Sequence, residues 1–174
     1  MPKVNFSKQA TASAVASVLA GRHIGTVIQI VGLGDQPAYD RADPPVPSVG
    51  IVVQCANFQI AKKMRISDSA YSTMYGYLNA SLPDPDAYSG DDPLPMTLGR
   101  PVAVEITVKK QFANIDSFQR PMDFELVDVP NVSADDLILL EGVESLTGDN
   151  AKTIFLKLHR DIRSWLSQRI RSAS

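Results

Sequence analysis

The chain has 174 residues, 44% of them hydrophobic and 21% charged, a length and composition typical of one globular domain. Its net charge of −2 is close to zero, so overall charge singles out no class of partner. The single cysteine, Cys55, excludes an internal disulfide, and no apolar run reaches the roughly 18 residues that span a bilayer. These features predict a cytoplasmic protein with no membrane partner.

In the N-terminal segment "KQATASAVASVLAG" an alanine-rich run follows Lys3 and Lys8, as in a signal peptide. Its apolar part is interrupted by Thr11, Ser13 and Ser17, which weakens that interpretation. We expect an arm or a short helix over residues 1–20.

Strand signals follow. Residues 25–33 and 48–56 are rich in β-branched side chains and are separated by a segment with four prolines, which predicts a hairpin with a long, stiff loop. A third strand is expected over residues 58–66. The spacing of Tyr71, Met74, Tyr75 and Leu78 then predicts a helix over about 68–81, which Ser67 can cap.

Residues 83–95 are dense in Pro, Gly and Asp and predict a surface loop. Residues 100–111 alternate apolar and polar side chains, the clearest strand pattern in the chain. The segments "FANIDSFQRP" and "DFELVDV" are expected to supply a fifth strand or its continuation. Residues 153–172 place apolar side chains on one stripe of an amphipathic helix, with a possible break near His159.

Three strands, a helix and two strands is the element order of an OB-fold barrel. We therefore predict a mainly β protein: a five-stranded OB-fold barrel over residues 21–130, with a helix between strands three and four. Residues 131–174 would form an acidic connector and a C-terminal amphipathic helix that packs on the barrel or on a partner.

Charge is locally polarised, because residues 121–149 hold eight acids and no base, whereas residues 150–174 hold six Lys or Arg and one acid.

Gly32 and Gly34 follow an apolar run, as in a phosphate-binding loop. The helix that a dinucleotide fingerprint requires cannot begin here, because Gln36 and Pro37 lead into a proline-rich stretch. The glycines are better explained as turn or bulge positions at a strand end.

A catalytic or metal site is not indicated. His23, His159 and Cys55 are not at ligand spacing. The pair Asp135/Asp136 is compatible with a magnesium-dependent nuclease, but an acidic stretch of this kind is more typical of a solvated surface. We expect no cofactor and no enzymatic activity.

Cations and aromatic residues gather near the third and fourth strands. Single-stranded nucleic acids bind such surfaces by stacking bases on aromatic rings while cations follow the phosphates. The residues that could do so are Phe58, Lys62, Lys63, Arg65, Lys109, Lys110, Phe112 and Arg120, with Tyr39 and Arg41 in the long loop. The sequence equally allows Phe58 and Phe112 to be core residues and the lysines to be merely solvated.

Several short motifs resemble a family of phage-encoded OB-fold single-stranded DNA-binding proteins over roughly residues 20–174. They are the Gly-x-His start of the first strand, an "LGxQ"-like turn, a "GxP" entry to the fourth strand, and the aromatic, "NI" and serine positions after it. The matching positions are Gly21, His23, Leu33, Gly34, Gln36, Gly99, Pro101, Phe112, Asn114, Ile115 and Ser117. Asp35 stands where the family often has Thr, and the chain ends in basic residues instead of an acidic tail.

The resemblance implies non-enzymatic binding of single-stranded DNA with little sequence preference, in phage replication or recombination, in the host cytoplasm. Replication or recombination proteins and further copies of the chain are the implied partners. The alternative is an OB-like protein-interaction adaptor in a phage replication or virion assembly.

Overall fold

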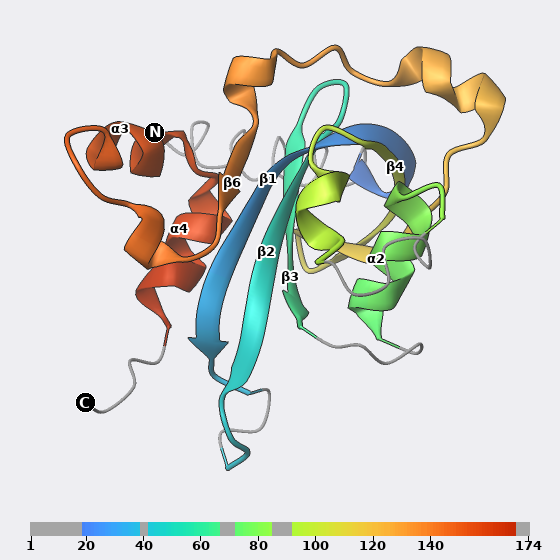
Figure 1. Cartoon of the computed structure of the whole chain (residues 1–174). Helices are drawn as coiled ribbons and strands as arrows, with labels where there is room; N and C mark the ends of the chain where they lie inside the picture. Colours follow the sequence, from blue (N-terminus) through green and yellow to red (C-terminus); the bar gives the residue numbers. More distant parts are fainter. Residues whose placement is uncertain (1–18, 39–41, 67–71, 85–91, 170–174) are drawn as a thin grey trace, which may run out of the picture.

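The structure is a computed structural model that describes residues 19–38, 42–66, 72–84 and 92–169 (Figure 1). Most of the predicted N-terminal arm, and the candidates Tyr39 and Arg41, lie outside these residues.

A three-stranded antiparallel meander comes first. It consists of β1 (Gly21–Gln36), β2 (Val46–Gln54) and β3 (Gln59–Arg65). The predicted hairpin is confirmed, since β1 pairs with β2 along most of its length. β1 is longer than expected because its first six residues pair with a different strand, β4.

The sheet continues from β1 to β4 (Pro101–Lys109) and then to β5 (Phe112–Gln119), giving the antiparallel order β3-β2-β1-β4-β5. A short strand, β6 (Ile138–Leu140), pairs with β1 in parallel. Within the described residues, backbone pairing runs as an open path from β3 to β5. The protein is therefore mainly β, as the alternation of apolar residues predicted.

Short helices surround this sheet. The predicted central helix is α2 (Thr73–Ser81), between β3 and the 3-10 helix η2 (Leu94–Thr97). The Ser72 hydroxyl caps α2 by accepting a hydrogen bond from the Tyr75 N–H at 3.1 Å. The expected C-terminal helix is broken into α3 (Ala151–Lys157) and α4 (Arg160–Ser167). The break falls at His159, near the position that the sequence indicated, and His159 caps α4.

The acidic segment is built from short 3-10 helices and one short strand. It contains the 3-10 helices η3 (Asp123–Asp128), η4 (Ala134–Asp136) and η5 (Val143–Ser145), with β6 between the last two. The prediction that "DFELVDV" continues the fifth strand is wrong. The Glu125 carboxylate accepts a hydrogen bond from the Met122 N–H at 2.9 Å, which closes the η3 turn instead.

Two apolar clusters lie on opposite faces of the β1–β2 ribbon. One is enclosed by the five main strands and by α2, and its largest fully buried side chain is Tyr77. The other joins Val31, Leu33 and Val52 to Ile162 and Leu166 of α4. Figure 1 shows α2 and α4 on opposite sides of this ribbon. The C-terminal helices therefore cover the outer face of the sheet.

Gly32 and Gly34 of β1 serve backbone geometry, as predicted. The register with β2 shifts between Gly32 and Gly34, and Gly34 has a φ of +66° that favours glycine. A Cβ on Gly32 would lie 1.9 Å from the carbonyl oxygen of Glu141, so this glycine permits close approach of the chain that follows β6.

Candidate nucleic-acid interface

The β4–β5 hairpin presents a cation and an aromatic ring side by side. Lys109 and Phe112 are directly paired across the hairpin, which puts their side chains on the same face. Phe112 is 78% exposed, unusual for a phenylalanine. This exposure excludes a core role for Phe112, one of the two interpretations that the sequence left open.

The tip of this hairpin is strained. Lys110 has a φ of 50° and Gln111 a φ of 73°, a left-handed conformation in which Asn-Gly is the favoured pair for a two-residue turn. Non-glycine residues in this region cost of order 1–2 kcal/mol each. A lysine and a glutamine at the tip are thus not explained by turn geometry.

Phe58 lies partly in the core, contrary to a simple surface role. It packs against the inner cluster, and its ring meets the His23 ring edge-on at a centroid distance of 5.0 Å. His23 is itself held by a hydrogen bond of 2.9 Å between its Nε2 and the Leu19 carbonyl. Phe58 is therefore a fixed aromatic side chain at the end of the β2–β3 connection.

A groove of about 480 Å³ joins the two phenylalanines. It is lined by residues from the start of β3, the start of β5 and the beginning of α4. Among these are Phe58, Phe112, Gln59, Gln111 and Arg160. Residues more than 50 positions apart in the sequence thus share one concave surface.

Charge in the groove is mixed. The Arg160 side chain is 85% exposed, and its Nε lies 3.4 Å from the Asp161 carboxylate. An exposed pair of this kind is weak, so the guanidinium can exchange it for another anion at little cost. Lys109 and Lys110 add positive charge from the adjoining hairpin.

His159 forms the wall next to Arg160. Its Nδ1 accepts a hydrogen bond of 3.0 Å from the Asp161 N–H, and this capping requires a ring nitrogen without a proton. Burial lowers the pKa of His159, an effect that Asp161 opposes and that Arg160 and Arg163 reinforce. The ring is thereby kept neutral at the start of α4.

The cations predicted on β3 do not share the groove. Lys62 lies on the β5 side, where its Nζ donates to the Ile115 carbonyl at 2.8 Å and to the Asn114 Oδ1 at 3.3 Å. Burial lowers the pKa of Lys62, although Asp116 opposes the shift. This ammonium joins β3 to β5 and is already occupied.

Lys63 and Arg65 point to the other face. The Lys63 Nζ lies 5.8 Å from the centre of the Trp165 ring of α4, in a cation–π contact. Arg65 is the last residue of β3 and lies six residues after Gln59, which lines the groove. At about 3.3 Å per residue this is a distance of roughly 20 Å. The predicted single basic surface on β3 is therefore wrong, because successive strand residues alternate between faces.

Arg120 is also engaged elsewhere. Its guanidinium donates to the backbone carbonyls of Asn79 and Leu82 at 2.7 Å each and of Pro83 at 3.2 Å. The Asn79 carbonyl lies in the last turn of α2 and the other two follow it, so none of the three has a helical donor. In this structure Arg120 therefore closes the end of α2.

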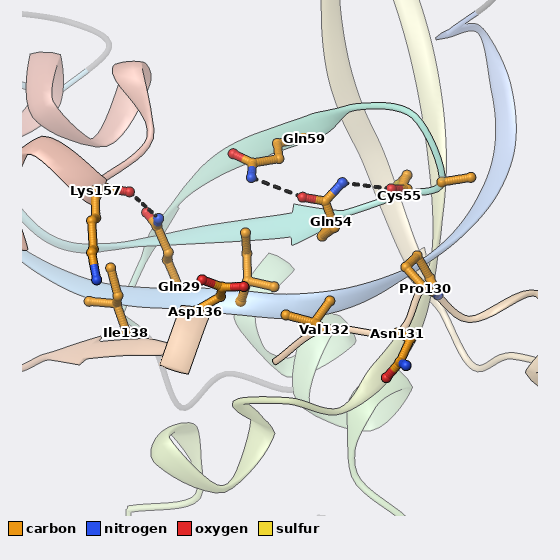
Figure 2. A pocket seen from close by; sticks show the side chains of 12 residues that line it. Gln29, Gln54, Cys55, Gln59, Pro130, Asn131, Val132, Asp136, Ile138 and Lys157 are labelled. Atoms are coloured by element: carbon orange, nitrogen blue, oxygen red, sulfur yellow. Dashed lines mark hydrogen bonds between the residues drawn. The ribbon is translucent and has the colours of Figure 1, made fainter. Parts of the chain in front are cut away.

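A second pocket, of about 480 Å³, lies on the outer side of the β1–β2 ribbon (Figure 2). Its side chains come from β1, from the end of β2 through the start of β3, from residues 130–138 between η3 and β6, and from the end of α3. The polar residues drawn there include Gln29, Gln54, Gln59, Asp136 and Lys157. Gln59 lines this pocket and the groove alike.

Cys55 lies in the wall of this second pocket but is 1% exposed. Burial raises the pKa of its thiol to about 12, so it carries no thiolate at neutral pH. Within the described ranges, no three His, Cys, Asp or Glu side chains are grouped so that they could hold a metal ion. Every helix in those ranges is too short or too polar to cross a membrane.

Sequence reasoning missed Arg160, Gln59 and Gln111. Arg160 follows the helix break that the sequence indicated at His159, but nothing in the sequence shows where that break lies on the sheet.

No family model, curated protein or solved structure matches this chain.

Proposed function

We propose that the chain is a phage-type OB-fold protein that binds single-stranded DNA with little sequence preference and without catalysis. The observation that carries the proposal is the groove in which Phe58, Phe112 and Arg160 meet. Stacking on aromatic rings, with cations on the backbone, is how sequence-tolerant binding of single strands is achieved.

The strand arrangement supports the OB-fold part of the proposal. The paired order ends with β3 on one side and β5 on the other, and the Lys62 ammonium bridges these two strands. α2 directs Met74, Tyr77 and Ala80 into the inner cluster, as expected of a helix that plugs one end of a barrel. A barrel of this order would close between β3 and β5.

In the proposed complex, Phe112 and the exposed part of Phe58 stack on successive bases. Lys109, Lys110 and Arg160 contact the phosphates nearby. The strained hairpin tip holds its lysine next to the stacking ring, consistent with a residue kept for binding at some cost in stability. Replication or recombination of phage DNA in the host cytoplasm is the proposed setting.

The test compares two equally exposed phenylalanines. Phe112 is 78% exposed and lines the groove, whereas Phe124 is 73% exposed and lies on η3 away from it. Phe112→Ala should weaken oligo(dT) binding by about 1–3 kcal/mol, and Phe124→Ala should leave it unchanged. Fluorescence anisotropy at several salt concentrations measures both, and log K should fall by roughly 0.7 per phosphate contacted for each tenfold rise in salt.

Absence of oligo(dT) binding at low salt would exclude this function and favour the adaptor. The observation behind that alternative is a set of exposed apolar side chains on and next to η3, among the acids of the same segment: Met122, Phe124, Leu126 and Val127. A partner for this surface would be basic with an apolar recess. Phe124→Ala would then weaken the partner complex and Phe112→Ala would not.

A further inference from the structure

The pocket on the outer side of the β1–β2 ribbon adjoins the groove. Gln59 lines both, and the α3–α4 junction borders both, with Lys157 in the pocket and His159 to Asp161 in the groove. A strand that leaves the stacking residues across Gln59 therefore reaches the pocket next. Its volume of about 480 Å³ is within the range of about 300–1,000 Å³ found for small-molecule sites.

Some polar groups of the pocket are part of its framework. The Gln29 amide donates to the Lys157 carbonyl at 2.9 Å, while its oxygen accepts from the His159 N–H at 2.9 Å. The Gln54 amide donates to the Cys55 carbonyl at 2.7 Å, and its oxygen accepts from Gln59 at 2.9 Å. Figure 2 shows the Gln54–Gln59 and Gln29–Lys157 contacts as dashed lines.

Two charged side chains that line the pocket are exposed and available to a ligand. Among the described residues, the Asp136 carboxylate and the Lys157 ammonium make no hydrogen bond or ion pair. The carboxylate can only accept hydrogen bonds and the ammonium can only donate them. A ligand that contacts both would therefore offer donors to Asp136 and an acceptor to Lys157.

We propose that this pocket receives one base of the bound strand and selects bases that carry an exocyclic amino group, guanine above all. The proposal rests on the DNA-binding function proposed above. Guanine offers two neighbouring donors, N1–H and N2–H₂, to the Asp136 carboxylate, and its O6 accepts from Lys157. Adenine and cytosine offer one amino donor beside a ring-nitrogen acceptor, which fits the same pair less fully.

Thymine is the base that the pocket disfavours. Its N3–H donor lies between two carbonyl oxygens, so a carboxylate that approaches this donor also meets two negative dipoles. Stacking in the groove accepts any base, because every base has an aromatic face. A largely unselective protein would thus carry one selective position.

The experiment uses the full chain and two oligonucleotides, dT₁₂ and dT₁₂ with one central dG. Because a hydrogen bond to a charged group is stronger than a neutral one, the dG-containing strand should bind about threefold to tenfold tighter. Asp136→Asn should abolish this ratio. Asp135→Asn, a change in the same η4 turn but outside the pocket, should keep it.

Lys157→Ala should also reduce the ratio, whereas Lys152→Ala, on the same helix but outside the pocket, should not. Equal affinity of the wild type for both strands would overturn the base-selective pocket and leave DNA binding intact. Loss of the ratio in Asp135→Asn would overturn it too, by showing an effect of net charge. If neither strand binds at low salt, the proposed function and the pocket's role both fail.

Discussion

At the scale of single residues, Gly32 shows how one missing side chain organises the outer face. A Cβ there would collide with the backbone of Glu141 at 1.9 Å, and backbone cannot rotate aside. We predict that Gly32→Ala lowers the free energy of unfolding by about 1–3 kcal/mol, the usual cost of overpacking. Urea denaturation followed by circular dichroism measures this.

The matched control is Gly76→Ala in the middle of α2. A Cβ at Gly76 would meet nothing within 4 Å, so the same substitution should stabilise the protein by roughly 0.5–1 kcal/mol through helix propensity. Equal effects of the two substitutions would contradict the close contact with Glu141.

At the scale of elements, Lys62 is the side chain that links β3 to β5. Lys62→Ala removes the donor to the Ile115 carbonyl and should cost about 1–2 kcal/mol of unfolding free energy. Lys63→Ala, one residue along, loses a cation–π contact between two half-buried side chains, Lys63 and Trp165, worth about 0.5–2 kcal/mol. If Lys62→Ala weakens oligo(dT) binding and leaves stability unchanged, Lys62 contacts phosphate after all.

The elements themselves could be read from the sequence. β-Branched runs and alternation predicted the five main strands, and Gly32 and Gly34 predicted the register shift between them. The opposite orientations of Lys62 and Lys63 also follow from strand periodicity, so grouping them on one surface was an error of interpretation. The position of α4 did not follow, because an apolar stripe predicts a buried face without identifying what it packs against.

The site was predictable only in part, because the sequence does not show which distant elements pack together. Phe58 and Phe112 could be named from their residue type, but their shared groove depends on β3 and β5 approaching through tertiary contacts. The contribution of Arg160 depends on the docking of α4. Two buried glutamines of β1 also hold the C-terminal helices. The Gln36 amide donates to the Trp165 carbonyl of α4 at 2.8 Å, and the Gln29 amide donates to the Lys157 carbonyl at the end of α3 at 2.9 Å.

At the scale of the whole molecule, two groups should make stability fall in acid in separate steps. Burial lowers the pKa of His159 from 6.5, so its contribution is present above pH 6.5 and is lost as pH falls through the folded-state pKa. A bidentate contact with Arg22 lowers the pKa of Glu125 from 4.5 to about 2, so that contribution persists above pH 4.5 and is lost towards pH 2.

Urea denaturation at a series of pH values tests this sequence of losses. His159→Gln should flatten the step that begins at pH 6.5, and Arg22→Met should flatten only the step below pH 4.5. A stability curve for His159→Gln that runs parallel to that of the wild type between pH 7 and pH 5 would contradict the role given to the neutral ring.

The docking of α4 on β1 and β2 also sets an order of events during synthesis. Val31, Leu33 and Val52 depend on Ile162 and Leu166 for cover, and about 110 residues separate β2 from α4. Synthesis proceeds at about 5–20 residues per second, so this apolar face stays exposed to solvent for roughly 5–20 seconds before α4 has been made. The nascent chain therefore passes through an aggregation-prone interval, and its length is set by the distance in sequence between the sheet and the helix that covers it.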